Sequence, residues 1–166
     1  MEQFLSSDYC LQCRGCCYFP EEISVWSPYV TETEIAALTK DHNGQTCITP
    51  TKSIRLVPDQ GEFRCIFLDP QSHACAIYPS RPLECRIYPF LLARREEKIF
   101  LAIDTYCPYV KEQMGTEHMK LYIERLVAFL NEPRQKSLVL NNPHLIHPYE
   151  EVVYLTELYG DFVPAR

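Results

Sequence analysis

Cysteines dominate the chemistry that this sequence could perform. Four of its nine cysteines lie within one stretch of eight residues, at Cys10, Cys13, Cys16 and Cys17. Thiolates separated by two residues can converge on one metal ion or iron-sulfur cluster without help from the rest of the fold. Four more follow at wider spacing and need tertiary folding to join them: Cys65, Cys75, Cys85 and Cys107. The sequence therefore predicts a metal centre held by these eight cysteines.

The spacing of the cysteines favours an iron-sulfur cluster and leaves zinc open. Cys10, Cys13 and Cys16 have the spacing with which ferredoxins present three thiolates to a 4Fe-4S cluster, and Cys107 precedes a proline as a remote fourth ligand often does. The side chains of adjacent cysteines such as Cys16 and Cys17 diverge, which favours two centres, or one cluster beside a further thiol. Eight thiolates would also suit two tetrahedral zinc ions, although zinc ribbons usually bring two closely spaced cysteine pairs.

Cys85 has the clearest local reason to be a thiolate. Ser80 is a good helix N-cap and Pro82 suits a first helical turn, so Cys85 is expected near the positive end of a helix. The helix dipole and the guanidinium groups of Arg81 and Arg86 would favour the charged form. The alternative is that Cys85 is a small core residue and that both arginines are solvated.

Two further arginines adjoin cluster cysteines. Arg14 directly follows Cys13, and Arg64 directly precedes Cys65. Guanidinium groups at these positions would offset the negative charge of a thiolate centre. Tyr78 and Tyr88 are expected to pack around the centre and shield it from water.

The elements that must position these residues are short and mixed. Thr31 and Glu34 form a capping box that starts a helix, and a loop is expected from Asp41 to Pro50. Short strands are expected at Ile54 to Val57 and Phe63 to Leu68, and a hairpin at Phe90 to Arg94 and Ile99 to Ile103 around a charged turn. A helix is expected from about Leu121 to Pro133, and another from Pro148 to Tyr159, ending at Gly160.

These elements predict one small α+β domain with short antiparallel strands and helices around a cysteine-ligated core. Within it, residues 1–109 are expected to form the cysteine-cluster region and residues 110–166 a helical C-terminal part. At 166 residues the chain is long enough for one ordinary core.

Composition and charge narrow the setting. An odd number of cysteines and no secretory signal predict a reducing cytoplasm, where clustered thiols bind metals or act catalytically. No apolar stretch is long enough for a membrane span, so no membrane association is expected. The net charge of −6 opposes a phosphate backbone, so nucleic acid is not an expected partner, whereas a protein partner stays open.

The pattern as a whole resembles the CxxCxxCC, or YkgJ-type, cysteine-cluster family, a zinc- or iron-chelating domain that includes the cysteine-rich part of flagellin lysine N-methylase. The resemblance covers Cys10 to about Pro108. It rests on the eight cysteines in order, on Gly15, on the Thr31 to Glu34 helix start and on the Arg81-Pro82 pair before Cys85. It implies metal or iron-sulfur binding by the eight cysteines. Cys47 lies outside the pattern, and His73 stands where a turn glycine would be unremarkable, so neither is an expected ligand.

Three functional hypotheses follow. The leading one is a metal-binding protein that holds an iron-sulfur cluster or zinc in a structural or redox role. A second is a metal-dependent protein-modifying enzyme like the methylase. The five glycines of this chain form no glycine-rich loop for a methyl donor, and no catalytic residue can be named. A third is a metal-handling or electron-transfer module that docks onto another protein.

Overall fold

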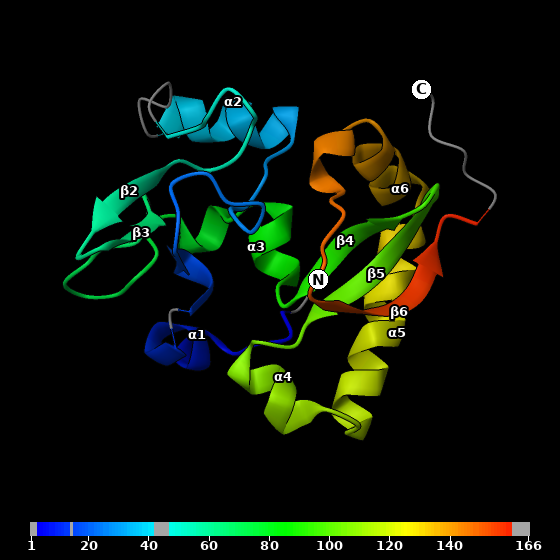
Figure 1. Cartoon of the computed structure of the whole chain (residues 1–166). Helices are drawn as coiled ribbons and strands as arrows, with labels where there is room; N and C mark the ends of the chain where they lie inside the picture. Colours follow the sequence, from blue (N-terminus) through cyan, green and yellow to red (C-terminus); the bar gives the residue numbers. More distant parts are fainter. Residues whose placement is uncertain (1–2, 14, 42–46, 161–166) are drawn as a thin grey trace. The chain divides into compact units, whose positions relative to one another are not determined.

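The computed structural model describes residues 3–13, 15–41 and 47–160. The chain divides into two compact units, and each is described by itself. The N-terminal unit is Leu5–Arg86, and the C-terminal unit is Ile87–Arg166 with Met1–Phe4. Each unit contains one small antiparallel sheet and helices, coloured in chain order in Figure 1. The expected α+β class with short antiparallel strands is confirmed.

The sheet of the N-terminal unit has a cysteine at the end of its central strand. Its strands β1 (Tyr18–Phe19), β2 (Leu56–Asp59) and β3 (Glu62–Cys65) lie in the order β1-β3-β2. Gln60 and Gly61 join β2 to β3 with φ of 49° and 93°, as a tight hairpin turn requires. Because Tyr18 pairs with Arg64, the Cys16-Cys17 segment leads directly to the strand beside Cys65.

The helices of the N-terminal unit are short. They are α1 (Ser7–Cys13), the 3₁₀ turn η1 (Gly15–Cys17), α2 (Glu32–Asp41), the 3₁₀ turn η2 (Tyr78–Ser80) and α3 (Leu83–Ile87). The expected capping box is confirmed, since Thr31 Oγ1 accepts the Glu34 amide at 3.2 Å and Glu34 Oε2 accepts the Thr31 amide at 2.9 Å. Most of the loop expected after α2 lies outside the described residues.

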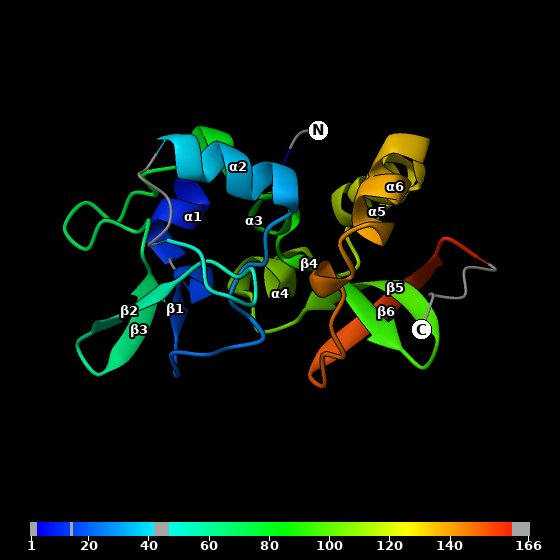
Figure 2. The same ribbon diagram turned by 90° about the horizontal axis from the view of Figure 1, so that it is seen from above.

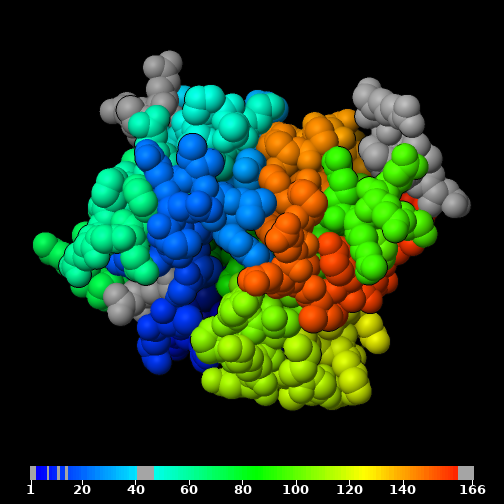
Figure 3. All heavy atoms as spheres, in the orientation of Figure 1, coloured from blue at the N-terminus to red at the C-terminus, as the bar shows by residue number. Residues whose placement is uncertain are grey.

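The segment between β1 and α2 forms a surface turn held by two buried serines. Ser24 Oγ accepts the Trp26 amide at 3.2 Å, and Ser27 Oγ donates to the Ile54 carbonyl at 2.8 Å. Ile23, on this turn, is 86% exposed. The segment is the medium-blue surface turned toward the viewer in Figure 3.

The sheet of the C-terminal unit contains the expected hairpin. Strands β4 (Phe90–Arg95) and β5 (Lys98–Asp104) pair in register from Phe90 opposite Ile103 to Arg95 opposite Lys98. Glu96 has a φ of 57° in the turn, so the charged tetrapeptide makes the reversal that the sequence predicts. Figures 1 and 2 show α5 and α6 on one face of this sheet.

The prediction of a helix from Pro148 to Tyr159 is wrong. Residues Val152–Leu158 form β6, which pairs antiparallel with β5 and makes the order β4-β5-β6. The segment is rich in β-branched and aromatic residues, which fit a pleated surface, and β5 offers it an edge of unpaired backbone groups. Pairing with β5 satisfies those groups, so tertiary structure overrides the helical spacing of the apolar residues.

The remaining helices follow the β4-β5 hairpin in the chain. They are α4 (Pro108–Gln113), α5 (Glu117–Asn131), α6 (Pro133–Leu140) and the 3₁₀ turn η3 (Pro143–Leu145). The expected α5 is confirmed: Met119, Tyr122, Leu126 and Leu130 form its buried face. Pro133 both ends α5 and begins α6, as proline at a first helical position allows. Within the described ranges, no helix has the length and apolar character needed to cross a membrane.

Candidate metal centre

The first two cysteines share one face of α1. Ser6 Oγ accepts the Tyr9 amide at 3.3 Å and starts the helix. Cys10 and Cys13 lie three residues apart, so their side chains project from neighbouring positions on its surface. Cys13 is exposed, and a Cβ built on Gly15 would lie 3.6 Å from its sulfur, an ordinary contact.

Cys16 and Cys17 interact with each other in η1. A hydrogen bond between their side chains raises the pKa of Cys16 well above its ordinary value, and burial of the Cys16 sulfur raises it further. Cys17 packs against the buried core of the N-terminal unit. The expectation that adjacent cysteines diverge is thus modified, since these two sulfurs touch.

Cys65 lies at the end of β3 and is buried. Burial raises the pKa of Cys65 to about 12, while the backbone amides of Phe67 and Leu68 donate to its sulfur and lower the pKa; the nearby thiols of Cys75 and Cys16 raise it. Amide groups two and three residues after a cysteine that point at its sulfur stabilise a thiolate, and hydrogen bonds of this kind tune metal-bound sulfur.

Cys75 is brought beside this turn by a compact loop. Leu68 and Cys75 form an antiparallel bridge, and the Ala76 amide donates to the Phe67 carbonyl at 2.8 Å. His73 has a φ of 58°, which agrees with the expectation that it occupies a turn position. Burial raises the pKa of Cys75, and the Ile77 amide lowers it.

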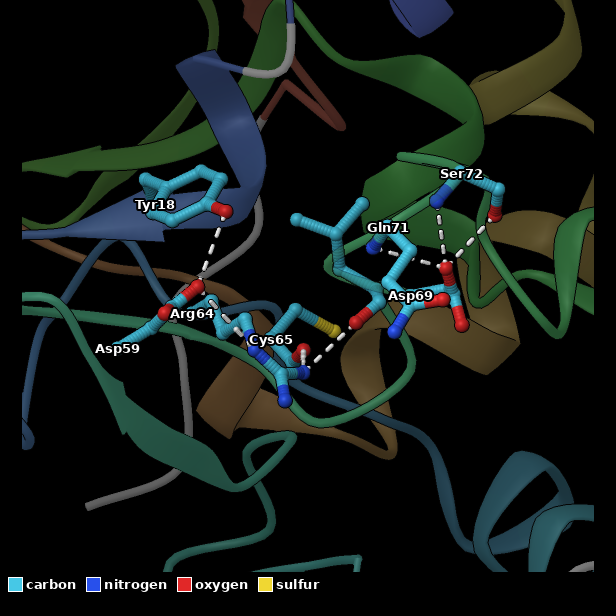
Figure 4. A network of polar contacts seen from close by, with 8 residues as sticks. Tyr18, Asp59, Arg64, Cys65, Asp69, Gln71 and Ser72 are labelled. Carbon is cyan, nitrogen blue, oxygen red and sulfur yellow. Dashed lines mark hydrogen bonds and ion pairs between the residues drawn. The ribbon is translucent and has the colours of Figure 1, made fainter.

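Asp69 holds the first half of the same loop. Its Oδ1 accepts hydrogen bonds from the Gln71 amide at 3.0 Å, the Ser72 amide at 2.6 Å and the Ser72 hydroxyl at 2.8 Å (Figure 4). The bond from the Ser72 amide is the largest cause of the lowered pKa of this carboxyl. The charged form is therefore the form that organises the loop.

We expect the 69–74 loop to lose order on acidification. Because the pKa of Asp69 is lowered in the folded protein, its contribution is present above the pKa of an unfolded aspartate and is lost as pH falls through the lower folded value. An NMR titration should show the Ser72 amide shift following a midpoint below that of an ordinary aspartate. Asp69→Asn should abolish this midpoint, and a midpoint at the ordinary value would contradict the bonding described.

The helix α3 carries Cys85 but is capped differently from the expectation. Glu34 Oε1, from α2, accepts the Leu83 amide at 2.7 Å, whereas Ser80 Oγ donates to the Ile77 carbonyl at 3.4 Å. The expected Ser80 cap is therefore wrong, because η2 ends at Ser80 and α3 begins only at Leu83. The side chain of Glu34 thus caps two helices.

The electrostatic argument for Cys85 also needs correction. Burial of its sulfur is the largest cause of a pKa well above the ordinary value, and Cys65, Cys16, Glu84 and Cys75 add to it in that order. Arg86 is exposed. A thiolate at Cys85 therefore needs the positive charge of a bound metal, because desolvation outweighs the helix dipole in this five-residue helix.

Arg81 supplies positive charge to other thiols. It lowers the pKa of Cys16 and of Cys75, although in both cases larger effects raise it. Its guanidinium carbon lies 3.6 Å from the centre of the Tyr78 ring, and its Nε donates to the Tyr78 carbonyl at 3.1 Å. Tyr78 therefore packs against the arginine that faces these two thiols.

The remaining residues that the sequence analysis singled out are Cys107, Tyr88, Arg14 and Cys47. Cys107 is buried in the C-terminal unit, directly before α4. Tyr88 also belongs to that unit, where its hydroxyl donates to Asp104 Oδ2 at 2.7 Å. Arg14 lies outside the described residues. Cys47 is 3% exposed and belongs to the core of the N-terminal unit, so it is a core residue rather than a surface thiol.

The guanidinium of Arg64 contacts a backbone carbonyl and a carboxylate. Its Nη1 donates to the Leu68 carbonyl at 2.7 Å, and its Nε lies 3.4 Å from Asp59 Oδ2 (Figure 4). Asp59 also accepts the Tyr18 hydroxyl at 3.1 Å. Sequence reasoning missed Asp59 and Tyr18, because the two residues are 41 positions apart and neither belongs to a recognisable local motif.

The structure thus brings together four thiols of the N-terminal unit, which raise one another's pKa: Cys16, Cys65, Cys75 and Cys85. None of the nine cysteines forms a disulfide. Within residues 3–13, 15–41 and 47–160, no three His, Cys, Asp or Glu side chains already stand in an arrangement that could hold a metal ion. The donor chemistry nevertheless fits a thiolate-bound metal, since several sulfurs combine enclosure with amide donors and one adjacent guanidinium.

Comparisons with known proteins concern the cysteine-rich part of the chain. A stretch of 43 residues is 42% identical to an uncharacterized protein of Methanocaldococcus jannaschii, covering 26% of this chain and 24% of that protein. No solved structure matches the chain. The family model named CxxCxxCC, described as "Putative zinc- or iron-chelating domain", matches residues 9–108, which include all eight predicted ligands. The chain therefore belongs to the CxxCxxCC family of cysteine-cluster domains.

Proposed function

We propose that the chain binds an iron-sulfur cluster, with zinc as the alternative, through the eight cysteines of the family pattern. The observation that carries the proposal is the group of four thiols in the N-terminal unit, each of which acts electrostatically on others of the group. In the neutral form these thiols pack as small apolar groups, and burial together with mutual repulsion disfavours their thiolates. A bound cation reverses this effect, because it stabilises the thiolates that burial otherwise disfavours.

The spacing of the first cysteines supports iron and sulfide over zinc. Cys10, Cys13 and Cys16 follow the ferredoxin pattern, and α1 followed by η1 places them on one continuous segment. Amide donors at Cys65 and Cys75 suit sulfurs that bear negative charge in either case. When bound, the cluster would stabilise the fold and store an electron.

The surrounding residues have separate tasks in this proposal. Arg81 offsets negative charge at Cys16 and Cys75, and Tyr78 holds that guanidinium in place. The amides of Phe67, Leu68 and Ile77 orient two sulfurs and stabilise their charge. These features fit a structural or electron-transfer role.

Anaerobic purification followed by elemental analysis tests the proposal. We expect protein kept without oxygen to carry iron and inorganic sulfide, to be brown, and to bleach in air. Stoichiometric zinc in a colourless preparation would show that the metal is zinc and not an iron-sulfur cluster, and the proposed metal centre would stand. Protein that folds fully without any metal and takes up neither metal on reconstitution would remove the proposal altogether.

A further inference from the structure

A chain of polar contacts joins three segments around Cys65. The Tyr18 hydroxyl, on the strand that continues from Cys16 and Cys17, donates to Asp59 Oδ2 at 3.1 Å. The same oxygen lies 3.4 Å from Arg64 Nε, and both side chains of this ion pair are mostly buried, at 19% and 17% exposure. Figure 4 shows the guanidinium between Asp59 on one side and the turn after β3 on the other.

The far side of the guanidinium holds the turn that contains the amide donors. Arg64 Nη1 donates to the Leu68 carbonyl at 2.7 Å and to the Cys65 carbonyl at 3.4 Å. The Leu68 amide donates to the Cys65 carbonyl at 3.0 Å, and the Phe67 and Leu68 amides also donate to the Cys65 sulfur. By holding the two carbonyls, the guanidinium fixes the turn that carries both amides beside the sulfur.

Two tasks for Arg64 can be distinguished by its contacts. A residue that offsets thiolate charge would lower the pKa of a thiol, as Arg81 does for Cys16 and Cys75. Arg64 instead has a carboxylate partner of its own and donates to backbone carbonyls. Because its Nη1 donates to the Leu68 carbonyl and its Nε faces Asp59, the guanidinium acts on the backbone of the turn.

We propose that Arg64 is a positioning residue for Cys65, which holds the Cys65–Leu68 turn so that its amides face the sulfur, and that Asp59 and Tyr18 fix Arg64 in that role. The inference rests on the proposed function, because the sulfur is positioned for ligation. Loss of the clamp would leave the thiolate with fewer amide donors. A cluster ligated by such a sulfur is harder to reduce, because hydrogen bonds to sulfur stabilise the added negative charge.

The test compares Arg64→Gln with Arg64→Lys and with the matched control Arg55→Gln. Arg55 is exposed and directly precedes β2 of the same sheet. Amide hydrogen exchange is measured in the reduced metal-free protein, and the midpoint potential in the reconstituted protein. We expect Arg64→Gln to speed exchange at Phe67 and Leu68 by about tenfold, as for loss of a typical hydrogen bond, and to shift the potential to more negative values.

The controls make each outcome decisive. Arg64→Lys should restore part of the protection, because an ammonium group can still donate to the Leu68 carbonyl, and Arg55→Gln should change neither quantity. Should Arg64→Gln fail to fold, Asp59→Asn should give a smaller change in the same direction. The inference would be overturned if Arg64→Gln kept the wild-type exchange rates and midpoint potential. It would also be overturned if Arg55→Gln changed both quantities as much as Arg64→Gln does. A wild-type protein that takes up no metal would instead remove the proposed function, which the exchange measurements do not address.

Discussion

Replacement of Cys85 by serine should lower the metal content and destabilise the protein by several kcal/mol. Its sulfur is enclosed and interacts with Cys65, Cys16 and Cys75, so a bound metal there would be coupled to the packing of α3. Metal-binding free energy in such centres is largely folding free energy. The measurement is metal per chain together with denaturant unfolding, each done with and without a chelator.

Cys47→Ser is the matched comparison, because it makes the same exchange of sulfur for oxygen. Cys47 is buried in the core, so we expect a loss of about 1–3 kcal/mol from placing a hydroxyl there. Metal content should stay at the wild-type value, and the loss should be the same with and without chelator. Equal loss of metal in both variants would show that the division into ligands and one bystander is wrong, and retention of metal by Cys85→Ser would remove Cys85 from the centre.

Replacement of Glu34 by alanine should destabilise the protein by about 2–3 kcal/mol, because the N-termini of two helices lose a carboxylate acceptor at once. One carboxylate oxygen accepts both the amide and the hydroxyl of Thr31 at 2.9 Å, and the other accepts the Leu83 amide at 2.7 Å. Part of the loss is offset at Glu84, a buried carboxyl whose pKa Glu34 helps to raise after burial. Denaturant unfolding monitored by circular dichroism measures the change.

Two variants control for the loss of the side chain. Glu34→Gln keeps acceptor capacity on one oxygen and should lose less stability than Glu34→Ala. Glu32→Ala, two residues earlier at the exposed start of α2, removes a surface ion pair with Lys52 and should stay within about 0.5 kcal/mol of wild type. If Glu32→Ala proved as costly as Glu34→Ala, the double-cap explanation would fail.

The parts of the fold that the sequence predicts are those set by neighbours in the chain. The Thr31 to Glu34 capping box spans three residues, and the β4-β5 hairpin closes around one charged turn, so local chemistry is sufficient for both. The strand β6 depends on pairing with β5, far away in the sequence, which the spacing of its own apolar residues does not report.

The candidate site shows the same division. Residue types and spacing identify the thiols and the left-handed turn at His73, because each is a local property. The cap on α3 comes from a residue 49 positions away, and a nearer serine offered a plausible local substitute. Burial of Cys47 and of the Cys85 sulfur is decided by the whole core, so local spacing did not report the burial of the first and underestimated desolvation of the second.

The N-terminal unit is one unbroken stretch, Leu5–Arg86, whereas the β4-β5-β6 sheet closes only when Val152–Leu158 reaches Lys98–Asp104. A chain leaving the ribosome therefore exposes all seven predicted ligands of the N-terminal unit before the last strand of the other sheet has been synthesised. Metal capture at those seven thiols can begin cotranslationally. The supply of iron or zinc during synthesis would then govern how much of the protein reaches its folded state.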